Sequence, residues 1–167
     1  FLRATFSGTL ARELASKLAI RDTEEAYICA MMHNLGRFLT LYYLPEEAEA
    51  VRRVLGGGRL SEEAASIRVL GMSYQELGIG VARSWAFPDA IVKGLRHLGE
   101  GAPRPPKSRE DMLRVIAGFA NEACTAFEQG EGEDLEQALG LLRKRYGAAL
   151  DVNDAQLRTA MQRAVNE

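Results

Sequence analysis

The sequence predicts an all-α fold, a single helical bundle, and two observations support that prediction. Apolar residues recur at intervals of three and four in segment after segment of the 167-residue chain, as they do along one face of an α-helix. No run of useful length alternates apolar and polar residues with the period of two that marks a half-buried strand. A chain of this length can bury its own core, and we expect residues 1–167 to form one domain.

The first helix is expected to run from the start of the chain to about Ile20. Phe6, Leu10, Leu14 and Leu18 follow one another at intervals of four, so one face of this helix should meet the core. The chain begins without methionine and already inside this helical pattern. We therefore expect it to be a piece of a longer polypeptide.

The central element is expected to be one helix over residues 27–44, which reads YICAMMHNLGRFLTLYYL and is apolar on nearly every face. Asp22 or Thr23 can cap its start, and Pro45 marks its end and opens the next segment. A helix of this kind belongs in the middle of a domain, with neighbours on both sides.

His33, Asn34 and Arg37 are the polar residues inside this apolar stretch. Burying an unpaired polar group costs on the order of 1 to 3 kcal/mol, so their presence needs a reason, and they are candidates for a site. Within a helix, a glycine such as Gly36 lowers stability by about 1 kcal/mol relative to alanine. We expect the close approach of another helix to explain it.

The remaining helices are expected to be shorter. Trp85, within the third of them, is expected to be a core residue, and His97 is expected to close the fourth. A proline- and glycine-rich stretch over about 99–109 reads as a surface connector. Ser61 is expected to cap the second of these helices, and Ser73 to start the third. The expected helical segments are 46–55, 61–69, 73–85, 89–98, 111–127, 135–146 and a last one begun by Asn153 with Gln156 in capping-box position.

The composition excludes several classes of partner. The formal net charge of −2 comes from acidic and basic residues mixed along the chain, which gives no general attraction to nucleic acid or to anionic lipid. The longest uncharged run, residues 26–36, is shorter than the roughly 20 residues of a membrane span, and no signal-peptide pattern precedes it. We expect a cytoplasmic protein with no membrane or nucleic-acid partner.

Cys29 and Cys124 both lie among apolar residues at helical spacing. Two cysteines so far apart resemble neither a disulfide framework nor a CxxC metal or redox pair. We expect both to be buried, reduced thiols.

Three segments resemble those of a known family. The stretch EEAYICAMMHNLGRFLTLYYLP resembles the segment in which proteins of the HD superfamily carry a His-Asp pair followed by Leu/Ile-Gly-Lys/Arg. QELGIGVARSWAFPDAIVKGLRHL is similar to a stretch of the HDOD branch, with its Trp-x-x-Pro spacing, and FLRATFSGTLARELA is similar to a third segment. The resemblance covers about residues 1–98 and implies a helical bundle of the HDOD type.

The departures from that pattern bear on chemistry. In active HD phosphohydrolases, the resemblance implies, histidines and aspartates from several helices bind one or two metals that activate a water. This chain has two histidines in all, and Asn34 stands where the pattern has aspartate. From these departures we expect no catalytic residues, no metal and no cofactor. Further positions without the expected histidine are Ala4, Ser73 or Tyr74, and Leu98.

The resemblance implies a non-catalytic signalling output or protein-interaction module of a larger bacterial regulatory protein. Its partners would be other domains of the same polypeptide or regulatory proteins. Two alternatives stay open: a residual metal-dependent phosphohydrolase acting on a nucleotide or cyclic dinucleotide, and a small-molecule or nucleotide sensor. The sensor's pocket, at the vestigial site, would be lined by His33, Asn34, Arg37 and His97. We expect His33 and His97 to lie close together, and for Arg37 a structural salt bridge is an equal alternative.

Overall fold

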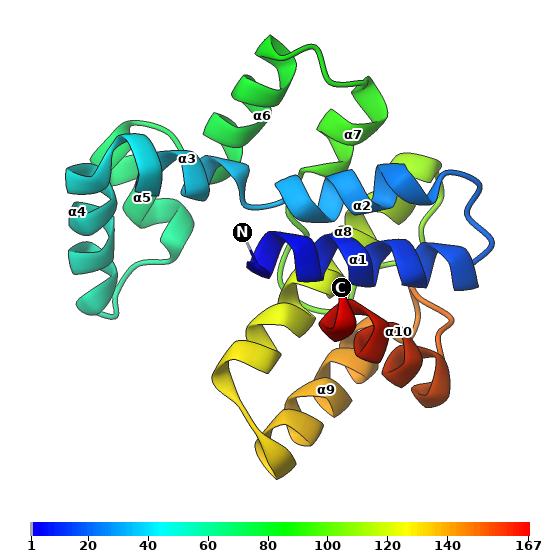
Figure 1. The fold of residues 1–167 in the computed structure, drawn as a ribbon. Coiled ribbons are helices and arrows are strands. Elements are labelled where there is room, and N and C mark those ends of the chain that lie inside the picture. Colours follow the sequence, from blue (N-terminus) through cyan, green and yellow to red (C-terminus); the bar gives the residue numbers. More distant parts are fainter. Residues whose placement is uncertain (1) are drawn as a thin grey trace. The chain divides into compact units, whose positions relative to one another are not determined.

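The structure is a computed structural model that describes residues 2–167, and this part of the chain consists of helices and loops with no strand (Figure 1). The prediction of an all-α fold is therefore confirmed. The helices of the described residues are α1 Leu2–Lys17, α2 Thr23–Met32, α3 Leu35–Tyr43, α4 Pro45–Gly56, α5 Glu62–Leu70, α6 Tyr74–Ser84, α7 Asp89–Gly94, α8 Arg109–Gln129, α9 Gly132–Tyr146 and α10 Asp154–Asn166.

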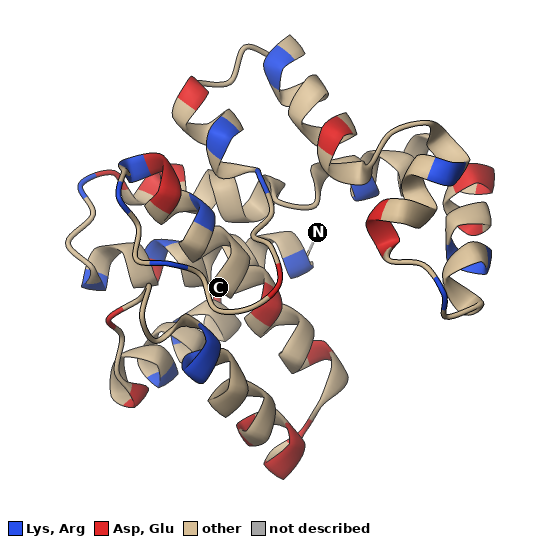
Figure 2. Ribbon diagram, turned by 180° about the vertical axis from the view of Figure 1, so that it is seen from behind, with Lys and Arg blue, Asp and Glu red and all other residues tan. Residues whose placement is uncertain are grey.

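The chain divides into two compact units, and each is described by itself. Unit 1 holds the residues up to His33 and those from Asp89 onward, and unit 2 holds Asn34–Pro88. Both signs of charge are distributed over the helices of each unit (Figure 2). No helix in the described part of the chain is long and apolar enough to cross a membrane. The prediction that residues 1–167 form a single domain stays a prediction.

The prediction of one central helix over residues 27–44 is wrong. Helix α2 ends at Met32 and α3 begins at Leu35, because Asn34 leaves the helical conformation with φ −107° and ψ 26°. The buried residues of α2, which are Ala26, Cys29 and Ala30, pack in unit 1, whereas those of α3, which are Leu35, Gly36 and Thr40, pack in unit 2. One apolar stretch of sequence therefore serves two separate cores.

Unit 1 is built around α8, the longest helix, which packs against α1, α2, α7 and α9. The side chain of Asn121 in α8 is buried. Its amide nitrogen Nδ2 donates hydrogen bonds to the carbonyl oxygens of Ala30 and Ala117, both at 2.9 Å. This amide ties α8 to the last turn of α2. Fully buried leucine and isoleucine side chains from α1 and α8 fill the space between the helices: Leu10, Leu14, Leu113 and Ile116.

Unit 2 depends on a close contact between α3 and α6. A Cβ atom added to Gly36 would lie 1.8 Å from the carbonyl oxygen of Tyr74 and 2.9 Å from the amide nitrogen of Gly78. The expectation that another helix approaches Gly36 is confirmed. Helix α4 packs against α3 and α5, and α5 packs against α6.

The helix-capping predictions hold for the most part. Asp22, Ser61, Ser73 and Asn153 each accept a hydrogen bond from the backbone amide three residues later. The first helix ends at Lys17, a turn earlier than expected. Local side-chain chemistry therefore sets most of the helix starts.

Trp85 is a correction to the predicted core. Its side chain is 55% exposed and contacts Phe87, with ring centroids 6.3 Å apart. It lies at the end of α6, where the helix stops and the chain turns through Ala86 with a positive φ of 57°. The helical spacing that suggested burial ends at this residue, so the ring is left outside the core.

Candidate functional site

His33 and His97 lie side by side in unit 1, although 64 positions separate them in the sequence. Their rings are stacked with centroids 4.2 Å apart and planes 21° apart. Nε2 of His97 lies 3.0 Å from the carbonyl oxygen of His33. The prediction that these two side chains lie close together is confirmed.

The position of His97 in its element differs from the prediction. Helix α7 ends at Gly94, so His97 lies in the loop after the helix and does not close it. The carbonyl oxygens of Arg96 and His97 accept hydrogen bonds from the guanidinium of Arg114 in α8, at 3.3 and 3.2 Å. Because a side chain of another helix satisfies these carbonyls, the backbone has no need to continue as a helix.

The imidazole of His33 is held in its neutral form. Its Nδ1 is buried and has no hydrogen-bond partner among the described residues. Burial, reinforced by the nearby His97 ring and the positive charge of Arg3, lowers the pKa of His33 to about 3. At neutral pH this side chain is therefore an uncharged imidazole with an unpaired nitrogen, which is an uncommon state for a buried polar group.

The two histidines do not form a metal centre of the kind that HD phosphohydrolases use. The lone pair of an imidazole lies in the ring plane, and a metal sits about 2.1 Å from a ligating nitrogen. Since the two rings are stacked and nearly parallel, no point at that distance lies in both ring planes. Within residues 2–167, no three His, Cys, Asp or Glu side chains are grouped so that they could hold a metal ion.

Asn34 and Arg37 belong to unit 2. Arg37 forms an ion pair with Glu62 of α5, and both line a cavity of about 390 Å³ that Tyr74 also borders. The structural salt bridge considered for Arg37 is therefore present. Of the four predicted pocket residues, the structure places His33 beside His97 in unit 1, and Asn34 and Arg37 in unit 2. The pocket formed by all four residues stays a prediction.

Sequence reasoning missed an exposed apolar surface at the end of α3, which we call the tyrosine patch: Leu41, Tyr42, Tyr43 and Leu44. Their exposed fractions are 55%, 78%, 70% and 41%. The two tyrosine rings meet edge to face with centroids 4.9 Å apart. The expectation of a buried central helix concealed this surface, although Pro45 is a signal that the helix ends here.

The cysteines are free and buried, as expected. Burial, with a contribution from Glu25, raises the pKa of Cys29 to about 12, and burial also raises the pKa of Cys124. The thiolate is the reactive form, so we expect both thiols to react with a disulfide reagent on the timescale of unfolding rather than in seconds. Absorbance at a series of reagent concentrations in native buffer checks this. Rapid labelling of either cysteine in the folded protein would contradict it.

Comparisons with known proteins show what this chain is similar to in sequence and in fold. A family model described as "HDOD domain" matches residues 2–99. An "Uncharacterized protein" of Treponema pallidum (strain Nichols) is 22% identical over 116 residues, which are 70% of this chain and 22% of that protein. The crystal structure of a "Putative phosphohydrolase" from Shewanella amazonensis SB2B aligns with a TM-score of 0.70 at 21% identity, over 99% of this chain and 58% of that one. This chain thus spans about a fifth of the first relative and just over half of the second.

Proposed function

The chain belongs to the HDOD family, and from that premise we propose that it is a non-catalytic signalling output and protein-interaction module of a larger bacterial regulatory protein. Its partner is another domain of the same polypeptide or a separate regulatory protein. The observation that carries this proposal is the tyrosine patch of unit 2. Binding at this surface would shift the populations of neighbouring domains through differential affinity for their states.

The chemistry of the patch suits protein recognition. Seven of the ten large hydrophobic side chains that are exposed in the described chain lie in unit 2, and four of them form the tyrosine patch. Tyrosine supplies a large apolar area with a polar end, and it is enriched among the residues that dominate binding energy at protein interfaces. Exposed aromatic and aliphatic side chains at one end of a helix therefore support an interaction role.

The Treponema relative supports the proposal that this chain is a module of a larger protein. The matched segment is only 22% of that protein, so the similar region there is one part of a much larger polypeptide. A small helical unit with an exposed aromatic surface is suited to contact neighbouring parts of such a chain.

Photo-crosslinking tests the interaction. A photoreactive phenylalanine derivative placed at Tyr42 in the full-length protein is expected to give a discrete adduct in cells, either within the polypeptide or with a second protein. The same group at Leu141, which is 69% exposed on α9 of unit 1, is the matched control and should give none. The Tyr42 adduct should disappear when Tyr43→Ser and Leu41→Ser are added. Equal amounts of nonspecific crosslinked product from Tyr42 and Leu141 would count against the proposal.

The non-catalytic part of the proposal yields a separate prediction. We expect the purified protein, reconstituted with manganese, iron or nickel, to hold no stoichiometric metal and to hydrolyse neither cyclic dinucleotides nor simple phosphoesters above background. The reason is the donor set: two stacked imidazoles, with the neutral amide Asn34 beside His33 in sequence, supply too few convergent ligands. Asn34→Asp alone should create no activity.

Elemental analysis and turnover assays check that prediction together. About one bound metal per chain, with turnover that His33→Ala abolishes, would overturn the non-catalytic reading. It would instead favour a residual metal-dependent phosphohydrolase acting on a nucleotide or cyclic dinucleotide.

A further inference from the structure

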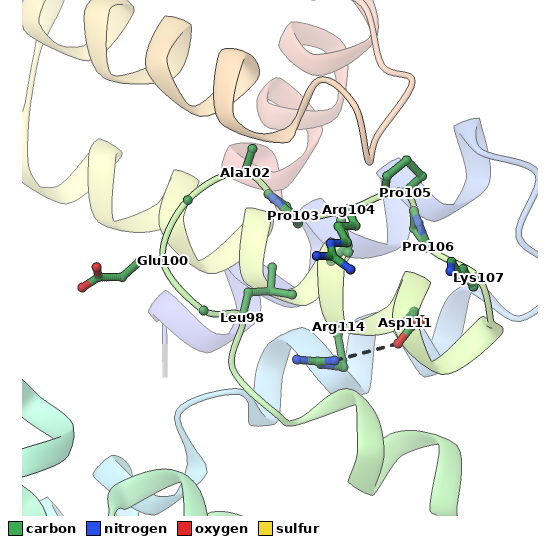
Figure 3. A pocket seen from close by; sticks show the side chains of 13 residues that line it. Leu98, Glu100, Ala102, Pro103, Arg104, Pro105, Pro106, Lys107, Asp111 and Arg114 are labelled. Atoms are coloured by element: carbon green, nitrogen blue, oxygen red, sulfur yellow. Dashed lines mark ion pairs between the residues drawn. The ribbon is translucent and has the colours of Figure 1, made fainter.

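The connector between α7 and α8 borders an open cavity in unit 1, and neither the two histidines nor the tyrosine patch lines it. Residues 98–107 pass over the first turns of α8 and leave a cavity of about 340 Å³ beneath them (Figure 3). This volume is at the lower end of the range of small-molecule sites. A proline- and glycine-rich segment that read only as a surface connector therefore forms one wall of a pocket.

The pocket carries an excess of positive charge. Three cations line it, Arg104, Lys107 and Arg114, against two carboxylates, Glu100 and Asp111. In Figure 3 the guanidinium of Arg104 lies inside the curve of the connector, whereas the carboxylate of Glu100 points away from it. Asp111 contacts Arg114 at 3.8 Å, and Arg104 and Lys107 form no ion pair within the described chain. A net positive charge in the lining favours an anionic ligand.

The walls of this pocket are held in place before any ligand arrives. Arg145 of α9 donates hydrogen bonds to the carbonyl oxygens of Gly99 and Gly101, at 3.0 and 2.8 Å, and it also pairs with Glu122 of α8. Gly101 has a φ of +88°, a conformation that glycine adopts without strain. On the opposite side, the bonds from Arg114 to the carbonyls of Arg96 and His97 fix its guanidinium. A site fixed in this way loses less conformational entropy when a ligand binds.

The geometry points to a binding site for a small phosphorylated molecule in this connector pocket. Arginine binds phosphate oxygens with two parallel N–H donors, which Arg104 can offer from the connector, and Lys107 adds a positive charge at the rim. Two nitrogens of Arg114 already donate to the carbonyl oxygens of Arg96 and His97, so Arg114 contributes positive charge rather than a free pair of donors. Leu98, Pro103 and Val115 supply apolar lining for the rest of the ligand. A phosphomonoester of a small ring compound, of the size of a nucleoside monophosphate, fits this combination.

Isothermal titration calorimetry with AMP, inorganic phosphate and adenosine tests the inference on the purified protein. AMP and phosphate are expected to bind with an affinity that falls as salt is added, and adenosine, which lacks the phosphate, at least about tenfold more weakly than AMP. Arg104→Ala should weaken AMP binding by about tenfold or more, because it removes a charge-assisted contact from an exposed loop position that the fold does not need.

Arg59→Ala is the matched control, since Arg59 is an exposed arginine of unit 2 far along the chain from the pocket. It should leave the affinity for AMP unchanged. Three results would each overturn the inference: no binding of phosphate or AMP at millimolar concentration, equal AMP affinity in the wild type and Arg104→Ala, or adenosine binding as tightly as AMP. The proposed interaction role of the tyrosine patch stands or falls independently of these results.

Discussion

Replacing Gly36 with alanine is expected to destabilise unit 2 by about 3 kcal/mol or more. The added Cβ would lie 1.8 Å from the carbonyl oxygen of Tyr74, and a backbone atom cannot rotate away as the end of a side chain can. The helices α3 and α6 would have to separate, which would remove contacts along their whole interface. Urea unfolding followed by circular dichroism and by the fluorescence of Trp85, the single tryptophan of the chain, measures the loss.

Gly80→Ala is the matched control for this substitution. Gly80 lies in α6, as Gly78 does, but a Cβ added there would meet nothing within 4 Å. The change should leave stability unaltered or raise it by up to about 1 kcal/mol, because alanine favours the helix over glycine. Similar effects of Gly36→Ala and Gly80→Ala would show that the α3–α6 contact is not the reason for Gly36.

The stability of unit 1 is expected to fall as the pH drops from about 6.5 towards 5, because His33 must stay neutral in the folded protein. The folded pKa is about 3 and the ordinary value is 6.5, so between these values the unfolded chain binds more protons than the folded one. Stability is then complete above pH 6.5 and decreases below it. The slope is at most about 1.4 kcal/mol per pH unit, or about 2 kcal/mol over this window.

A comparison of the wild type with His33→Gln isolates this contribution. Glutamine is uncharged throughout the window, and most carboxylates titrate below pH 5, so the variant should lose most of the pH dependence. Urea midpoints at several pH values between 5 and 7 measure both proteins. The same slope in both would mean that His33 gains access to water or to a partner when it is protonated, and that its burial does not govern the stability of the unit.

The features that could be predicted from the sequence are those that depend on local chemistry. Apolar spacing predicted an all-helical fold, and the caps Asp22, Ser61, Ser73 and Asn153 follow from side chains that satisfy free amides at helix starts. The proximity of His33 and His97 is different, because periodicity carries no information on it. That prediction came from the resemblance of two segments to one family.

How the apolar stretch over residues 27–44 packs could be learned only from the three-dimensional structure. It placed α2 in one core and α3 in another, broke the helix at His33 and Asn34, and left Tyr42, Tyr43 and Trp85 exposed to solvent. It also paired Arg37 with Glu62 and brought Arg104 and Arg114 to one pocket. Periodicity shows which residues can share one face of a helix, but it does not show which other helix covers that face, because that depends on contacts between residues far apart in the chain.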